Sequence, residues 1–298
     1  MFPIALQKYE DQIVRKVCLA LLLSGMTVIL LLIAFLVKES SLFDNFGVPL
    51  VDFLFRQPWA PLATPPTFGI HHAWVSTLVV SGIGLAIAVP LGVGLGLFIA
   101  EVAPDYIRKI LQPALELLAG IPAVVYGFFG YITLVRSFEG WFDMPAGECL
   151  MIAGLVLSVM VLPFIASTAA ETFQGVALEL KDAALTLGVT HLYLTRRVLF
   201  KKALPGIFAA VALGLARALG ETLAVLMLAG NSVALPQSLL DRGQPITALI
   251  ATELGETGLM SQKYKAIYAS GFILLAFVIV INLIVWSIKR RSLRHVHG

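Results

Sequence analysis

Arg217 and Glu221 are charged residues inside a long apolar stretch, in the run RALGET at 217–222. Four residues separate them, so on a continuous helix they would share one face. Charges at bilayer depth are costly, and they usually face a protein interior or a water-filled path. A cation and an anion placed there together therefore predict a polar route across a membrane.

The chemistry that this pair suggests is transient recognition of an oxyanion. The planar guanidinium of Arg217 suits phosphate oxygens, and Glu221 one turn away would hold it in place. A paired cation binds an anion more weakly than a free one, and transport requires entry without capture. We interpret the pair as part of a pathway. The alternative is an ion pair that only orients its helix.

The composition requires a membrane around these charges. Of 298 residues, 59% are hydrophobic and 13% are charged, and the mean hydropathy is +0.92. Soluble domains carry about 25% charged residues. Spanning a bilayer takes about 20 apolar residues. Six segments qualify, near 17–37, 74–100, 111–135, 150–170, 203–230 and 267–288.

Features within these segments predict their packing and orientation. The glycine-rich segment 74–100 predicts close helix packing, because small residues let membrane helices approach. Pro122 and the glycines around it interrupt the third segment. The first apolar run is too long for a signal peptide, so we expect a retained helix. Basic residues gather in the segments that lie inside if both termini are cytoplasmic.

The segment 171–203 is the longest predicted cytoplasmic loop. Residues 179–187 predict a short helix, with Gly188 after its end and Thr190 capping a second helix from His191 to about Lys202. Two short helices joined by a glycine turn would form a knob that projects into the cytoplasm. This knob is either a helix pair on the membrane surface or a docking site for a soluble partner.

The run DAALTLG at 182–188 resembles the EAA-type loop of ABC importer permeases, in which an acidic residue, two alanines, three residues and a glycine form the helix that docks on the ATPase. Asp182 stands where that family usually has Glu, and Lys201 where it has Pro. The resemblance implies an ATPase-coupling loop made of Glu179, Asp182, Ala183, Ala184 and Gly188.

Two further runs, GIPAVVYGFFG at 120–130 and RALGETLAVLM at 217–227, resemble phosphate-specific permeases, the C-type subunit more than the A-type. The resemblance covers about residues 70–288. It implies an all-α membrane protein with the type I (MetI-like) importer fold and six transmembrane helices. The substrate path would include Arg217, Glu221 and Thr222. We expect an N-terminal part at 1–73, a permease core at 74–290 and a tail at 291–298.

The same resemblance implies the partners. These are an A-type permease subunit, two ATPase subunits and a periplasmic or lipid-anchored phosphate-binding protein. The complex would sit in a bacterial inner membrane in contact with membrane lipid, and no nucleic-acid partner is expected. The chain has no Gly-x-x-x-x-Gly-Lys-Ser/Thr loop. ATP and Mg²⁺ are therefore expected on the partner ATPase, with no cofactor, metal or catalytic residues on this chain.

Two alternatives remain open. The chain is a permease for another oxyanion, such as molybdate, tungstate or sulfate, or it is a secondary transporter that works without ATP. The third- and fifth-segment motifs disfavour the first alternative, and the docking loop disfavours the second. An enzyme is disfavoured because no nucleophile–base set stands out in the sequence.

Overall fold

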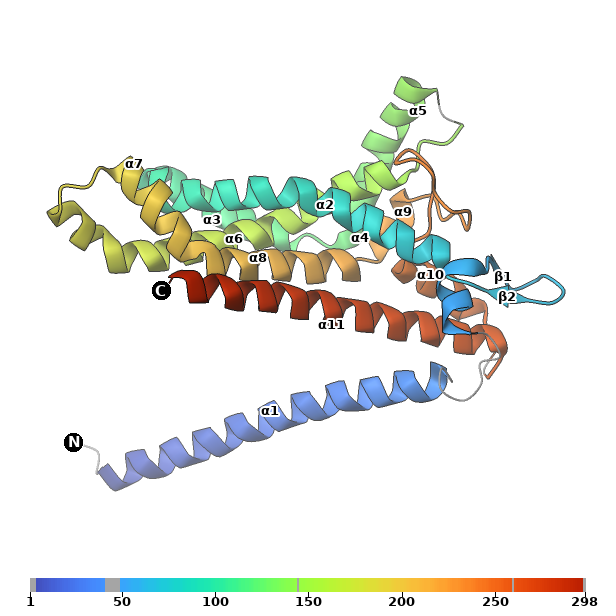
Figure 1. Ribbon diagram of the computed structural model, residues 1–298, viewed down its shortest axis with the longest axis horizontal. Helices are drawn as coiled ribbons and strands as arrows, with labels where there is room; N and C mark the ends of the chain where they lie inside the picture. The colour runs from blue at the N-terminus through green and yellow to red at the C-terminus, as the bar shows by residue number, and fades with distance from the viewer. Residues whose placement is uncertain (1–3, 41–48, 144, 259, 297–298) are drawn as a thin grey trace.

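The computed structural model describes residues 4–40, 49–143, 145–258 and 260–296. Within these ranges the side chains of 4–12, 178, 179, 182, 183, 185, 191, 288, 289 and 291–296 are not described. The molecule is an elongated bundle of helices with one short β-hairpin (Figure 1).

The long helices are α1 (Ile4–Ser40), α2 (His71–Leu97), α6 (Leu150–Thr186), α8 (Phe200–Gly220) and α11 (Gln262–Val296). The shorter ones are α3 (Asp105–Gly120), α4 (Ala123–Gly130), α5 (Arg136–Phe142), α7 (His191–Tyr193), α9 (Leu223–Leu228) and α10 (Ile246–Glu253). Single π- or 3₁₀-helical turns are η1 (Asp52–Arg56), η2 (Phe98–Val102), η3 (Tyr131–Val135), η4 (Leu194–Leu199) and η5 (Leu254–Glu256). Strands β1 (Trp59–Ala60) and β2 (Thr67–Phe68) pair antiparallel.

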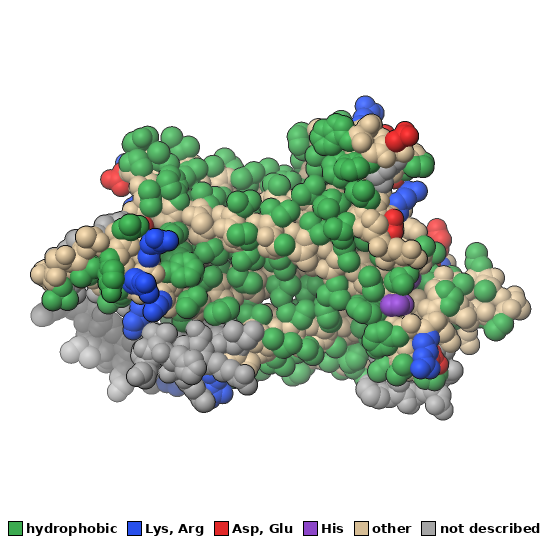
Figure 2. Space-filling view, turned by 45° about the horizontal axis from the view of Figure 1, so that its top comes forward, with side chains coloured by type: hydrophobic (Ala, Val, Ile, Leu, Met, Phe, Trp, Pro, Cys, Tyr) green, Lys and Arg blue, Asp and Glu red, His purple; other side chains and the backbone are tan. Residues whose placement is uncertain are grey.

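Five of the six predicted spans are found as helices long enough to cross a membrane, and the sixth is present if a sharply bent helix pair is counted as one span. Among the described residues, five helical stretches are long and apolar enough to cross a membrane: Ile13–Ser40, His71–Val102, Leu150–Ala177, Leu194–Gly220 and Gln262–Ser287. The sixth is the pair Asp105–Gly120 and Ala123–Phe142, which bends by 89° at its break. Figure 2 shows hydrophobic side chains covering the middle of the molecule, with charged ones toward its two ends.

The core lies where α2 packs along α6. Val80 of α2 and Leu157 and Ile165 of α6 belong to one buried apolar cluster, which α8 and α9 complete. By contrast, none of the apolar window of α1 is buried. Figure 1 shows α1 standing away from the bundle except at one end, where the Phe35 and Tyr268 rings meet edge to face at 5.6 Å.

Gly92 and Gly96, four residues apart, allow the α2–α6 contact, as the sequence predicts. A Cβ built on Gly96 would lie 2.7 Å from the Cβ of Ala169 and 2.8 Å from the Ala170 nitrogen. Gly92 is similarly tight, 2.9 Å from Cγ2 of Ile165. The prediction does not extend to every glycine of this helix, because a Cβ on Gly94 would meet nothing within 4 Å.

The helices around 171–203 differ from the prediction of a separate two-helix knob. Residues 179–186 are the end of α6, which is one continuous helix from Leu150 to Thr186. The second predicted helix likewise continues through α7 and η4 into α8. The reason is that 171–178 contains no proline and its one glycine, Gly175, does not end the helix, so the fourth span extends beyond the membrane. We call this helix–turn–helix, residues 177–201, the α6–α8 hairpin.

The tight glycines generate a prediction about stability. Gly96→Ala places a methyl group against the α6 backbone, and overpacking of this kind costs about 1–3 kcal/mol. We expect a lower thermal unfolding temperature of the purified complex. Gly94→Ala is the matched control and should be neutral or slightly stabilising, because alanine is the better helix former. Equal melting temperatures for the two variants would contradict the packing described here.

Candidate functional site

Arg217 and Glu221 do not share a helix face, and this part of the sequence prediction is wrong. Helix α8 ends at Gly220, and Glu221 has an extended backbone with φ −69° and ψ 129°. Helix α9 starts again at Leu223. The fifth span predicted to 230 is thus interrupted at 221–222. Among the described residues, no ion pair joins Arg217 to a carboxylate.

Arg217 is held instead by an aromatic ring. Its Cζ atom lies 4.1 Å from the centroid of the Phe164 ring, in a cation–π contact between α8 and α6. Its Nε atom is buried and has no hydrogen-bond partner among the described residues. The guanidinium also lies near enough to Tyr126 for a Coulombic interaction. Arg217 is therefore positioned by stacking, and no carboxylate of the described residues accepts a hydrogen bond from it.

The Glu221 carboxylate caps the start of helix α9. Its Oε1 accepts hydrogen bonds from the backbone N–H of Thr222 at 3.2 Å and of Ala224 at 3.4 Å. These N–H groups have no helical partner at the start of α9, and the carboxylate satisfies them. Thr222 donates from Oγ1 to the Gly220 carbonyl at 3.3 Å. Glu221 and Thr222 therefore stabilise the break itself.

A second break lies beside the first. Helix α3 ends at Gly120, Ile121 is extended, and Pro122 precedes α4. Pro lacks an N–H and disfavours a helical conformation at the residue before it. The Tyr126 hydroxyl spans this break and donates to the Leu118 carbonyl at 2.9 Å.

The helices that follow the two breaks, α4 and α9, pack on each other. A Cβ on Gly127 would lie 2.9 Å from the Met227 sulfur and 3.0 Å from the Ala224 Cα. The motifs at 120–130 and 217–227, about a hundred residues apart in the sequence, are thus in direct contact. We call this contact, with Arg217 beside it, the helix junction. The sequence predicted both motifs but contained no sign that they touch.

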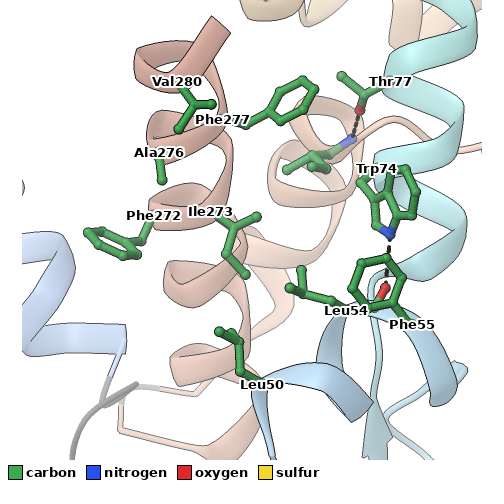
Figure 3. A pocket seen from close by; sticks show the side chains of 11 residues that line it. Leu50, Leu54, Phe55, Trp74, Thr77, Phe272, Ile273, Ala276, Phe277 and Val280 are labelled. Atoms are coloured by element: carbon green, nitrogen blue, oxygen red, sulfur yellow. Dashed lines mark hydrogen bonds between the residues drawn. The ribbon is translucent and has the colours of Figure 1, made fainter. Parts of the chain in front are cut away.

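Sequence reasoning missed the residues that anchor the junction from other helices. The Thr247 hydroxyl on α10 donates to the Glu221 carbonyl at 2.8 Å. Next to it, the backbone N–H of Ile246 donates to the Thr77 hydroxyl on α2 at 3.0 Å (Figure 3). Phe164 and Thr247 are ordinary residues in apolar runs, and only their contacts across the fold reveal them.

The large hollow between α2, η1, α10 and α11 is a poor site for an anion. Its lining is apolar apart from Thr77 and the Trp74 ring nitrogen (Figure 3). Both are already engaged, because Trp74 Nε1 donates to the Leu54 carbonyl at 2.8 Å and Thr77 binds Ile246. An oxyanion would lose its hydration there without gaining donors.

The turn of the α6–α8 hairpin has the predicted local geometry. Gly188 has φ +68°, a left-handed conformation in which glycine carries no steric penalty. Val189 N–H donates to the Ala184 carbonyl at 3.2 Å, and Tyr193 N–H to the Thr190 hydroxyl at 3.4 Å. Glycine after the helix end and threonine as cap are both confirmed.

The hairpin makes an ion pair with η2, the helical turn that follows α2. Lys181 Nζ lies 3.7 Å from a carboxylate oxygen of Glu101, whose side chain is almost fully buried. Ala184 packs against the buried cluster of Ala177, Leu194 and Leu199 between the two arms. The predicted coupling residues Glu179, Asp182 and Ala183 lie on α6, but their side chains are outside the described part of the structure. Leu187 at the tip is 80% exposed.

Comparisons with known proteins place these features in a family. The family described as "Binding-protein-dependent transport system inner membrane component" matches residues 92–297. A probable ABC transporter permease protein, YqgH of Bacillus subtilis, is 32% identical over 96% of this chain and 92% of its own length. The phosphate transport system permease protein PstC of Haemophilus influenzae is 34% identical over 79% of each chain. That of Pasteurella multocida is 35% identical over 83% of this chain and 81% of its own.

Solved structures agree on the fold. A bacterial alginate ABC transporter, in complex with a periplasmic protein bound to an alginate pentasaccharide, has a chain that aligns with a TM-score of 0.62 at 17% identity, covering 95% of this chain and 97% of that one. A chain of the MetNI methionine ABC transporter, in an inward-facing conformation, aligns with a TM-score of 0.54 at 20% identity, over 73% of this chain and 91% of that one. The chain therefore belongs to the family of binding-protein-dependent transport system inner membrane components, as a multi-pass permease of the ABC-importer type.

Proposed function

We propose that this chain is the C-type permease subunit of an ATP-driven importer for inorganic phosphate. It pairs with an A-type permease subunit, receives phosphate from an external binding protein and takes its energy from two ATPase subunits. ATP and Mg²⁺ bind to those ATPases, and this chain performs no catalysis. Both termini lie in the cytoplasm, on the side of the α6–α8 hairpin; the N-terminus, the C-terminus and α7 lie toward one end of the molecule (Figure 1).

The observation that carries this proposal is the position of Arg217 at the helix junction. Interrupted helices with polar ends toward a central site are a common way to build a transport path. Glu221 is engaged with the backbone N–H groups of α9 and, within the described residues, forms no ion pair with Arg217. The guanidinium can therefore donate hydrogen bonds to an oxyanion, while its cation–π contact with the Phe164 ring fixes its position. The phosphate permeases among the relatives support phosphate over other oxyanions.

The hairpin offers a direct mechanical link to this site. Its two arms are the ends of α6 and the helix leading into α8, and these two helices carry Phe164 and Arg217. At 1.5 Å per residue, the helical path from Phe164 to the tip of α6 is about 30 Å. A movement of the docked ATPases that changes the angle between the arms therefore reaches the Arg217–Phe164 contact through two continuous helices.

The function is tested by uptake of radiolabelled phosphate into proteoliposomes that contain this chain, an A-type subunit and the ATPase, with the phosphate-binding protein outside. We expect uptake that depends on ATP and is unaffected by excess sulfate, molybdate or tungstate. If the complex takes up one of those anions in preference to phosphate, that anion and not phosphate is the substrate. Uptake without ATP would exclude the importer mechanism.

Arg217 has a specific prediction. Arg217→Gln removes the charge, and because a charge-assisted hydrogen bond contributes about 1.5–3 kcal/mol, phosphate uptake should fall tenfold or more. Arg217→Lys retains the charge but loses the planar stacking geometry and should lie in between. Arg136→Gln on α5, an exposed arginine away from the junction, is the control. If Arg217→Gln assembles normally and transports at the wild-type rate, Arg217 is not on the path.

We predict that Thr247 supports transport through its hydrogen bond to the Glu221 carbonyl, which fixes the interruption between α8 and α9. Thr247→Val keeps the size of the side chain but leaves the Glu221 carbonyl without its donor, so the break is less well fixed and uptake should fall several-fold. Thr247→Ser should restore it. Thr133→Val is the control, because that hydroxyl donates only to the Phe129 carbonyl of its own helical segment. Thr247→Val should lower the maximal rate of phosphate uptake while the ATPase subunits stay bound. If Thr247→Ser loses as much activity as Thr247→Val, packing and not the hydrogen bond is responsible.

A further inference from the structure

A hollow on the outer face of the α6–α8 hairpin gathers three cations. It is lined by Thr190, Leu192, Tyr193, Arg196, Arg197 and Lys201. We call it the basic hollow. Figure 2 shows a cluster of Lys and Arg side chains at the left end of the molecule, the end that carries α7 in Figure 1. The proposed transport function does not use these residues.

The cations of the basic hollow differ from their neighbours at the same end of the molecule. Lys181 is paired with Glu101 at 3.7 Å, and Arg108 donates to the Ile99 carbonyl at 3.0 Å and lies 3.9 Å from Asp105. Within the described residues, no carboxylate lies within ion-pair distance of Arg196, Arg197 or Lys201. Three like charges around one hollow repel each other, and an anion bound between them removes that repulsion.

The height of the hollow in the membrane indicates what kind of anion fits. The helical stretch that is long and apolar enough to cross a membrane is Leu194–Gly220, so the hollow, lined by residues 190–201, lies at one end of that stretch. Arginine and lysine at this level extend their charges toward the headgroup region. Beside them, Leu192 and Tyr193 are 66% and 57% exposed. A ligand with a phosphate group next to an apolar chain fits this surface, because the phosphate would face the three cations and the chain would face Leu192 and Tyr193.

We propose that the basic hollow binds the headgroup of an anionic phospholipid from the inner leaflet. The two guanidinium groups offer paired N–H donors to the phosphodiester oxygens, and Lys201 adds a third charge. The exposed Leu192 and Tyr193 side chains contact the glycerol backbone and the first part of the acyl chains. A bound lipid thereby fixes one arm of the hairpin against the membrane surface.

The test is lipid retention by the purified complex of this chain with its A-type subunit and ATPases. Native mass spectrometry after exchange into equal phosphatidylglycerol and phosphatidylcholine should show phosphatidylglycerol bound to the wild type. A variant with Arg196→Gln, Arg197→Gln and Lys201→Gln should retain about tenfold less, because each basic residue near an anionic surface contributes to the attraction. Arg196→Lys with Arg197→Lys keeps the charge but not the paired donors, and should lose part of the retention.

The control removes three charges outside the basic hollow, with Lys16→Gln, Lys109→Gln and Arg136→Gln, and should retain phosphatidylglycerol within twofold of the wild type. Equal retention in the basic-hollow variant and the wild type would overturn the proposal. So would normal lipid retention together with loss of the ATPase subunits, since the hollow would then contact a protein. Displacement of the lipid by free inorganic phosphate at millimolar concentration would show a phosphate site and not a lipid site.

Discussion

A membrane-spanning chain must satisfy its backbone hydrogen-bonding groups internally, because the hydrocarbon offers no alternative partner. Two helices of this protein break within the membrane region, at Ile121 and at Glu221, and each break is satisfied by a nearby side chain. The Tyr126 hydroxyl donates to the Leu118 carbonyl, and the Thr247 hydroxyl donates to the Glu221 carbonyl. The Glu221 carboxylate accepts from the backbone N–H groups at the start of α9. These bonds let two irregular segments exist at bilayer depth, and they bring Arg217 to the place where the segments meet.

The α6–α8 hairpin connects this junction to the outside of the membrane. Because α6 is unbroken from Leu150 to Thr186, a displacement at the hairpin turn is carried along a helix instead of being absorbed in a loop. Glycines at 92 and 96 set α2 directly against the same helix, and Glu101 in η2, which follows α2, is paired with Lys181 of the hairpin. The packed helices and the hairpin therefore form one mechanical unit, which is what transport driven by an external ATPase needs.

The sequence predicted what depends on local composition. Hydropathy identified the spans, Pro122 the first break, and Gly188 and Thr190 the geometry of the hairpin turn. It failed where a feature depends on contacts between distant residues. The spacing of Arg217 and Glu221 suggested a shared helix face, but the helix ends at Gly220 and the carboxylate turns to the α9 backbone. The continuity of α6 through 179–186 was also missed, because a cap-like glycine after a short amphipathic run resembles a separate helix. Phe164 and Thr247 have no local signal at all, since their partners lie 53 and 26 positions away along the chain.

The central claim is that phosphate passes Arg217 at the helix junction. The most direct test places a cysteine at Thr222, in a chain whose two native cysteines are replaced, and measures its rate of reaction with a small anionic thiol reagent in the assembled complex. Phosphate delivered by the binding protein should slow this reaction, and the protection should disappear when Arg217→Gln is added. A reaction rate that phosphate does not change, or protection that is the same without Arg217, would contradict the account.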